Sequence, residues 1–257
     1  MLETRPPEHA TLLAWLGPLM LVGLWAILTS LSLFPESLLP HPLAAARGFV
    51  QELESGRLRA DTVASLFRVA VGFFLAAAMG VPVGLLVGHS AHARAALLPL
   101  VNFFRSLSPL AWIPFAILWL GIGDPPAIFL IFMAAFFPIV LSTSAAVASI
   151  PSVYFRVARD LGIDGWEVVR EVTLPAIAPQ VITALRLAAG LSWLVLVAAE
   201  MIAGRDGLGF AVWDARNGLR IDLLAATMVV IGLIGIAVDR LLLVLTRMPS
   251  LRWGYDR

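Results

Sequence analysis

The chain has 257 residues, of which 60% are hydrophobic and 14% charged, with a net charge of +1 and a mean hydropathy of +0.91. This composition excludes an ordinary soluble domain and indicates an integral membrane protein. Cysteine is absent and all 18 basic residues are arginine, which excludes disulfides, cysteine zinc sites and the lysine of a phosphate-binding loop. If ATP drives this protein, another chain must bind it.

The first half of the chain predicts two spans and one interfacial helix. Residues 10–33 carry no charge, are too long for a signal-peptide core and lack a clear cleavage site, so we expect a first span. Residues 43–55, between Pro42 and Gly56, place apolar side chains on one helical face and predict an interfacial helix. A second span is expected over 62–87, where glycines and Pro82 favour close helix packing.

The next stretch predicts a broken span and a regular one. Residues 88–95 are typical of a turn. The third apolar region, 97–120, contains Arg105, Ser106, Ser108, Pro109 and Pro114, so it is not expected to be straight. A Gly/Pro turn over 121–126 then leads to a fourth span over 127–148.

Residues 149–180 form the one long polar interruption of the second half. Val153, Val157 and Leu161 recur at four-residue spacing after Pro151, which predicts a short helix that ends at Gly162. A bulky side chain at that glycine would obstruct the turn, particularly if the backbone there needs a positive φ.

A second short helix is expected directly after that turn. Asp164 and Glu167 have the spacing of a capping box. The apolar stripe of this helix consists of Ile163, Trp166, Val169 and Val172. We expect the helix to end at Leu174, Pro175 and Pro179. The segment therefore predicts a helix, a sharp turn and a second helix.

The remaining spans are expected over 181–203 and 223–245, with a Gly-rich connection between them. The fold class is therefore all-α: one domain over 1–257, with six transmembrane helices and a two-helix loop between the fourth and fifth. Six spans put both termini on one side. Placing the termini inside puts nine arginines inside, including Arg156, Arg159 and Arg170, against six outside. The loop and both termini are thus predicted to be cytoplasmic.

The loop resembles that of binding-protein-dependent ABC importer permeases. Their pattern of Glu-Ala-Ala, three residues, Gly, nine residues and Ile-x-Leu-Pro is matched by Ala158, Gly162, Val172, Leu174 and Pro175. The pattern's leading Glu-Ala is Arg-Val here. The resemblance extends over about 61–245, and the strings at 108–123, 136–143, 194–201 and 207–217 are similar to the taurine, alkanesulfonate, nitrate and bicarbonate branch.

This resemblance implies a multi-pass permease of the bacterial inner membrane that imports a small oxyanion and is not itself an enzyme. It implies a second copy of the chain, two cytoplasmic ABC ATPase subunits that bind ATP and Mg, and a periplasmic or lipid-anchored substrate-binding protein, within membrane lipid and without nucleic acid. No cofactor or metal is expected in this chain. The residues expected to couple to the ATPase are Ala158, Leu161, Gly162, Ile163, Trp166, Val169, Leu174 and Pro175.

Alternatives remain at this stage. The loop residues alone also fit a hairpin lying on the membrane surface. A secondary transporter or channel would couple intramembrane charges, but few charges approach the spans. A membrane enzyme would need histidines or paired carboxylates inside the spans, and none are predicted there.

Four residues are candidates for the solute pathway or its gate. Arg105 is expected about 12 Å along the third span, beside Ser106 and Ser108, where a cation is costly unless it faces a pathway or a partner. It could equally snorkel to the surface or pin the kinked helix. Glu200 is expected near the outer end of the fifth span, where pairing with Arg68 would make it a structural ion pair or gate.

Overall fold

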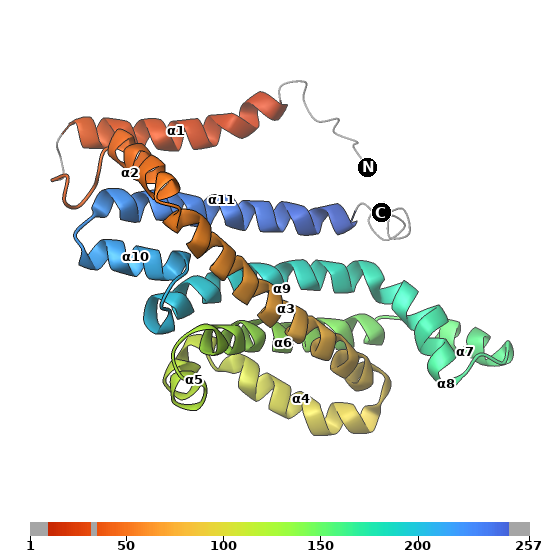
Figure 1. Ribbon diagram of the computed structural model, residues 1–257. Helices are drawn as coiled ribbons and strands as arrows, with labels where there is room; N and C mark the ends of the chain where they lie inside the picture. Colours follow the sequence, from red (N-terminus) through yellow and green to blue (C-terminus); the bar gives the residue numbers. More distant parts are fainter. Residues whose placement is uncertain (1–9, 32–34, 247–257) are drawn as a thin grey trace. The chain divides into compact units, whose positions relative to one another are not determined.

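A computed structural model describes residues 10–31 and 35–246, with the side chains of 16–31 and 35–243. Every regular element in these ranges is a helix (Figure 1), which confirms the all-α prediction. The chain forms two compact units: one from residues before 60 together with 211–230, the other from 60–210 together with residues after 230. The single permease domain over 1–257 stays a prediction.

The first unit contains α1 (Ala10–Ser30) and α2 (Pro42–Glu54). The Trp25 indole N–H donates to the Pro40 carbonyl at 3.0 Å and ties the end of α1 to the start of α2. His41 caps α2, because its Nδ1 accepts from the Leu43 N–H at 3.2 Å, and Pro42 occupies the first turn, where its missing N–H costs nothing. The helix predicted over 43–55 is confirmed; its place at the membrane interface stays a prediction.

Most of the helical bundle belongs to the second unit. Its helices are α4 (Ala91–Ser106), η1 (Pro109–Trp112), α5 (Ile113–Leu120), α6 (Asp124–Ala148), α7 (Ser152–Asp160), α8 (Gly165–Glu167), the π-helical turn η2 (Val168–Thr173) and α9 (Leu174–Ala203). Three further helices have residues in both units: α3 (Arg57–His89), α10 (Leu208–Asn217) and α11 (Ile221–Thr246). The helix α10 lies in the stretch that the sequence indicated only as a Gly-rich connection.

Four described helical runs are long and apolar enough to cross a membrane: α3, α6, Gly165–Ala203 and Ile221–Leu243. A fifth span results if the bent pair of α4 with η1 and α5 counts as one. The described apolar part of α1, Leu16–Ser30, is shorter, and residues 32–34 of the predicted first span lie outside the described residues. The count of six spans therefore stays a prediction. The orientation also stays one, since Arg5 and the arginines after residue 246 lie outside the described residues.

The third apolar region is broken as predicted, with an angle of 86° between α4 and the helical turns from Pro109 to Leu120. Leu107 and Ser108 are extended between them, as expected for residues that lead into a proline. The turn predicted over 88–95 is wrong. Only Ser90 interrupts the helices, because its hydroxyl oxygen caps α4 by accepting from the Ala93 N–H at 3.2 Å.

Close packing of α3 on α6 explains the glycines of the second span. Glycines at four-residue intervals face α6, and a Cβ on any of them would lie within 3 Å of an α6 atom; they are Gly72, Gly80, Gly84 and Gly88. The opposing α6 residues are Ile131, Ile139, Thr143 and Val147, so the two helices run in the same direction. Small residues at this spacing let helix backbones approach in lipid, as the sequence predicts.

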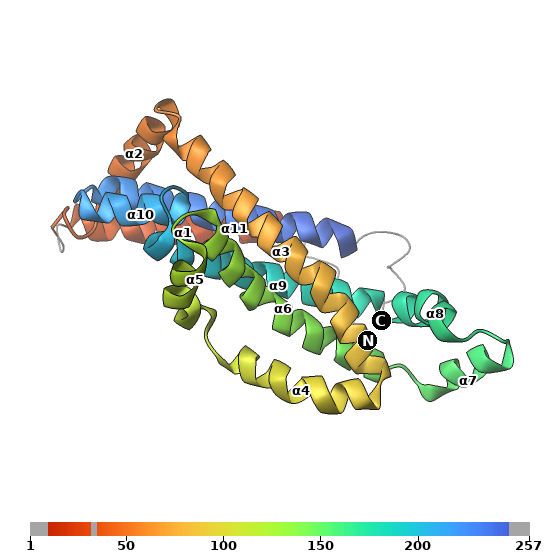
Figure 2. The ribbon, with the colours of Figure 1, turned by 60° about the horizontal axis from the view of Figure 1, so that its bottom comes forward.

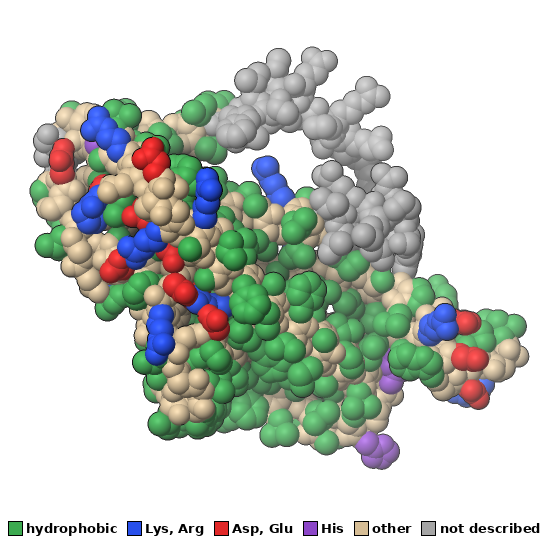
Figure 3. All heavy atoms as spheres, in the orientation of Figure 1, with side chains coloured by type: hydrophobic (Ala, Val, Ile, Leu, Met, Phe, Trp, Pro, Cys, Tyr) green, Lys and Arg blue, Asp and Glu red, His purple; other side chains and the backbone are tan. Residues whose placement is uncertain are grey.

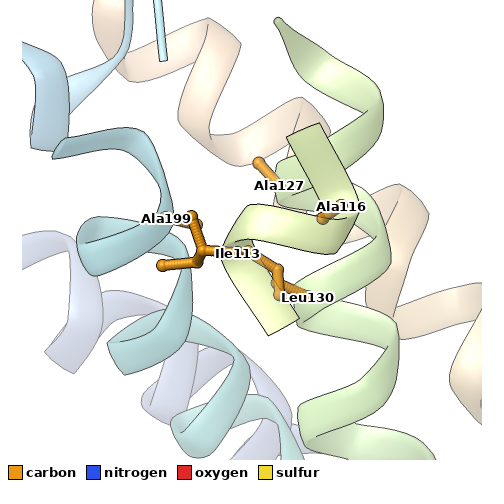
Figure 4. Packing of buried hydrophobic residues seen from close by; sticks show 5 residues of the cluster. All are labelled: Ile113, Ala116, Ala127, Leu130 and Ala199. Carbon is orange, nitrogen blue, oxygen red and sulfur yellow. The ribbon is translucent and has the colours of Figure 1, made fainter. Parts of the chain in front are cut away.

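The bent region is held by a small apolar cluster. Ile113 of α5 lies between Leu130 of α6 and Ala199 of α9, with Ala116 and Ala127 beside them (Figure 4). All five are buried. The three alanines are small enough to let α5 pack against α6 and α9, so the break becomes a fixed part of the fold.

Candidate functional site

The segment from α7 to η2 lies beyond the ends of α6 and α9 in both views of the ribbon (Figures 1 and 2). Helix α7 ends in a Schellman motif: the Ile163 N–H donates to the Ala158 carbonyl at 2.9 Å, and the Gly162 N–H to the Arg159 carbonyl at 3.0 Å. Gly162 has φ +77°, a conformation that glycine adopts without steric cost. The short helix and its end at Gly162 lie where the sequence predicts them.

Apolar side chains on this segment face outward. Leu161 is 72% exposed and Trp166 71%, and Val153 and Val157 are about half exposed on the same stripe of α7. Figure 3 shows these segments carrying charged side chains of both signs beside the apolar ones. An exposed apolar surface with a charged rim is typical of an interaction site.

Most of the other predicted coupling residues are partly or wholly covered. Ala158 is buried, Ile163, Val169 and Leu174 are half-buried, and Pro175 is exposed. Leu161 and Trp166 are therefore the large apolar side chains at the turn that a partner can contact. Ala158 and the half-buried residues pack within the protein instead.

The capping box predicted at Asp164 is wrong. Asp164 is the N-cap residue of α8, but its side chain makes no capping hydrogen bond. The next residue, Gly165, has φ +53°, so the chain enters α8 from a left-handed turn. In a standard capping box the residue after the N-cap is already helical, whereas Gly165 is left-handed here.

The predicted end of the second helix at Leu174, Pro175 and Pro179 is also wrong. The helix continues from Gly165 to Ala203 as one run of 39 residues. The wider π turn η2, in which the Leu174 N–H donates to the Val169 carbonyl, lies just before Pro175. A proline lacks its N–H and clashes with the carbonyl four residues earlier, and a wider turn accommodates both. The predicted fifth span therefore begins at Leu174 rather than at 181.

His89 anchors this joint to α3. Its Nδ1 lies 3.0 Å from the Leu85 carbonyl and its Nε2 2.9 Å from the Thr173 hydroxyl, while its ring packs edge-on against Phe155 of α7. Thr173 is fully buried. His89, the exposed last residue of α3, therefore links α3 to α7 and η2.

At the opposite end of α9 a buried ion cluster surrounds Arg68 of α3. Its Nη1 lies 2.6 Å from Oε1 of Glu200, its Nε 2.6 Å from Oδ1 of Asp124, and its Nη2 pairs with Asp206. The Arg68 side chain is 2% exposed and Glu200 is fully buried. The predicted Arg68–Glu200 pair is present, and it joins α3, α6, α9 and the loop after α9.

The same cluster fixes the loop that leads into α10. Glu200 accepts from the Ser65 hydroxyl at 2.8 Å and from the Gly209 N–H at 2.9 Å. Ser65 in turn accepts from the Leu208 N–H at 2.9 Å, and Asp61 from the Gly207 N–H at 2.8 Å. Gly207 has φ +101°, and a Cβ there would collide with the Glu200 carboxylate. The Gly-Leu-Gly string is therefore required by this contact.

Residues Arg105, Ser106 and Ser108 do not converge on a site. All three are exposed; Ser106 donates to the Asn102 carbonyl at 2.8 Å, and Ser108 leads into η1 without a side-chain cap. Since α4 begins at Ala91, Arg105 lies about 21 Å along it, in its last turn. Its depth in the membrane and a role in the pathway stay predictions.

Sequence reasoning missed four members of the ion cluster, namely Asp61, Ser65, Asp124 and Asp206. Asp61 and Ser65 share α3 with Arg68, but their partners are Glu200 and the loop after α9, which lie more than 130 residues further along the chain. Asp124 and Asp206 meet Arg68 from other parts of the chain, so local spacing does not reveal these contacts. A usable signal exists: the acidic residues flank the same ends of their spans as Arg68 and Glu200 do.

Comparison with known proteins agrees with this geometry. The model of the family "binding-protein-dependent transport system inner membrane component" matches residues 80–249. The chain is 39% identical over 250 residues to the bicarbonate transport system permease protein of Synechococcus elongatus, covering 92% of this chain and 88% of the relative. It is 37% identical over 205 residues to a putative ABC transporter permease protein of Methanocaldococcus jannaschii, covering 79% and 74%.

A third relative and a solved structure extend the comparison. The nitrate import permease protein of Synechocystis sp. is 41% identical over 177 residues, covering 69% of this chain and 64% of the relative. An inward-facing structure of the MetNI methionine ABC transporter superposes with a TM-score of 0.60 at 25% identity, covering 76% of this chain and 99% of that one. The chain therefore belongs to the family of binding-protein-dependent transport system inner membrane components, and it is a permease subunit of an ABC transporter.

Proposed function

We propose that this permease moves a small oxyanion into the cytoplasm, driven by ATP hydrolysis in separate subunits that dock on the segment from α7 to η2. Nitrate and bicarbonate are the first candidates, because the relatives named for these solutes align over most of this chain. The observation that carries the proposal is the exposed apolar pair Leu161 and Trp166 at a turn that lies beyond the span ends.

The coupling role follows from how this turn is connected. Trp166 and Glu200 lie on the same uninterrupted helical run, near its two ends. A partner that pushes on Trp166 therefore acts on a segment that continues through the bundle to the ion cluster. The His89–Thr173 contact adds α3 to this connection. ATP closing a partner dimer would in this way favour one of two packing states of the spans.

The proposed assembly holds two copies of this chain, two cytoplasmic ATPase subunits that bind ATP and Mg, and a substrate-binding protein on the outer side. A second copy is included because one chain of this size hardly encloses a solute pathway, and a closed two-fold arrangement is the usual one. With the segment from α7 to η2 in the cytoplasm of a bacterial cell, the Arg68 cluster lies toward the outer face.

Uptake into proteoliposomes that hold the complete transporter tests this function. With ATP enclosed and the binding protein outside, we expect accumulation of labelled nitrate or bicarbonate, and none with a non-hydrolysable ATP analogue. Accumulation driven by a proton or sodium gradient without ATP would instead identify a secondary transporter. ATP hydrolysis without uptake of either anion would remove both from the proposal.

A further inference from the structure

We propose that a hollow between α6 and α9 is the inner part of the solute pathway, where hydroxyl and amide groups carry the anion. The inference rests on the proposed function, and it names the residues and the chemistry that function uses. The hollow has a volume of about 350 Å³; its lining residues are Ser142, Ala145, Ala146, Ser149, Gln180, Thr183, Ala184 and Leu187. It belongs wholly to the second unit.

The hollow occupies the half of the two spans nearest the coupling segment. Ser149 follows the last residue of α6, and Ser142 lies about 10 Å further into the span. On α9, Gln180 is about 9 Å and Leu187 about 20 Å from the start of the helix at Leu174. The two helices are antiparallel, so these positions face each other from the span end to about its middle.

The floor is made of small residues and the walls of polar ones. Ala146 and Ala184 are buried between the helices, whereas Ser142, Gln180 and Thr183 are exposed at the rim. This is the only stretch of α6 from Pro126 onward with exposed residues, since the preceding turns pack on other helices. The absence of bulky side chains opens the hollow.

The polar groups differ in what they offer a solute. The Thr183 hydroxyl donates to the Pro179 carbonyl at 3.0 Å and the Ser149 hydroxyl to the Ala146 carbonyl at 2.7 Å, within their own chain segments. Neither the Ser142 hydroxyl nor the Gln180 carboxamide forms a hydrogen bond with another described residue. These two groups keep donors for a passing solute. In lipid they would lack partners, which is costly.

This chemistry fits a small oxyanion in transit. The lining carries neither a carboxylate to repel an anion nor an arginine to hold it by a bidentate pair. The nearest charged residue along α9 is Arg186, and it forms an ion pair with Asp239 at 2.6 and 2.7 Å. A volume of about 350 Å³ holds about ten waters, so an anion can pass with part of its hydration.

The isosteric change Gln180→Glu places a negative charge in the hollow and tests the anion pathway. We expect ATP-driven uptake of nitrate or bicarbonate to fall at least tenfold, because the new carboxylate repels an anion that passes next to it. Gln180→Met, which is neutral, should reduce uptake less than threefold. The control is Gln51→Glu in α2, the same amide-to-acid change at an exposed residue outside the hollow, which should leave uptake within a factor of two.

Cysteine labelling gives a second readout that does not depend on the stability of these variants. The natural chain has no cysteine, so Ser142→Cys and Thr183→Cys each carry a single thiol. In the assembled transporter, we expect a charged, membrane-impermeant thiol reagent to modify both, nitrate or bicarbonate to slow the reaction, and modification to stop uptake. Phe74→Cys, an exposed apolar position on α3, should stay unmodified.

The outcomes separate the inference from the function on which it rests. If the unmodified transporter shows no ATP-driven anion uptake, the proposed function fails. If it does, but Gln180→Glu transports normally, or the thiols at 142 and 183 resist the reagent like the one at 74, the hollow is not the pathway. Modification that neither anion slows and that leaves uptake intact overturns the inference equally.

Discussion

Nη1 of Arg68 lies 2.6 Å from Oε1 of Glu200, and both side chains are almost completely excluded from solvent. A buried charge that loses its partner is strongly destabilising, by about 3–5 kcal/mol. We therefore expect Arg68→Met to lower the stability of the detergent-solubilised chain by that order, measured by thermal denaturation. Glu200→Gln should destabilise as well, since its amide would meet the donors of Ser65, Arg68 and Gly209.

An exposed ion pair supplies the control for this prediction. Arg57 pairs with Asp214 at 2.6 Å, but their side chains are 43% and 49% exposed. Arg57→Met should cost less than about 1 kcal/mol. Equal losses for Arg57→Met and Arg68→Met would mean that the buried cluster does not stabilise the fold.

The turn at Gly162 predicts a graded effect on assembly with the ATPase. Gly162→Val forces a β-branched residue to φ +77° and should weaken the turn by about 1–2 kcal/mol, whereas Gly162→Asn should be milder because asparagine tolerates this region. The measurement is the amount of ATPase subunit that copurifies with the permease. Identical recovery for both variants would show that the turn conformation does not matter for docking.

Trp166 predicts an anchor at the same interface. Trp166→Ala removes the most exposed large aromatic side chain of the segment and should lower the affinity for the ATPase subunits at least tenfold, by titration of the purified subunits. Trp213→Ala in α10, also at a partly exposed tryptophan, is the matched control and should leave the affinity unchanged. A loss of the same size in both variants would point to a general effect on folding.

The joint between His89 and Thr173 predicts a further loss. Thr173→Val keeps the shape of the side chain but removes the hydrogen bond to His89 Nε2, so we expect about 0.5–1.5 kcal/mol of destabilisation and less uptake for each ATP hydrolysed. Thr227→Val is the control: this threonine is also buried, but its hydroxyl donates only to the Leu223 carbonyl of its own helix. Normal coupling in Thr173→Val would remove the joint from the mechanism.

The α3 glycines predict a steric test of the packing on α6. A Cβ at Gly84 would lie 2.6 Å from Cβ of Thr143, so Gly84→Ala should destabilise by about 1–3 kcal/mol in a denaturation series. At Gly23 of α1 no atom lies within 4 Å of the added Cβ, and Gly23→Ala should be neutral or slightly stabilising. A stable Gly84→Ala variant would contradict the close approach of the two helices.

Local patterns predicted the helices of this chain well and the joints between them poorly. The apolar stripe of α7 and its glycine end could be found from spacing, because both depend on neighbours along the chain. Pro175 was interpreted as a helix end, but a preceding π turn lets the helix pass through it, and no local pattern signals that turn. Asp124 and Asp206 meet Arg68 only in three dimensions, so their role required the folded chain.

The unbroken helical run of 39 residues from Gly165 to Ala203 has a mechanical consequence. At about 1.5 Å per residue it is a rod of about 58 Å. If it pivots near its midpoint as one body, a tilt of about 10° moves each end by about 5 Å, in opposite directions. A tilt that the ATPase causes by moving Trp166 would then move Glu200 in the opposite direction. The helical run would in this way act as a lever between the two faces of the membrane.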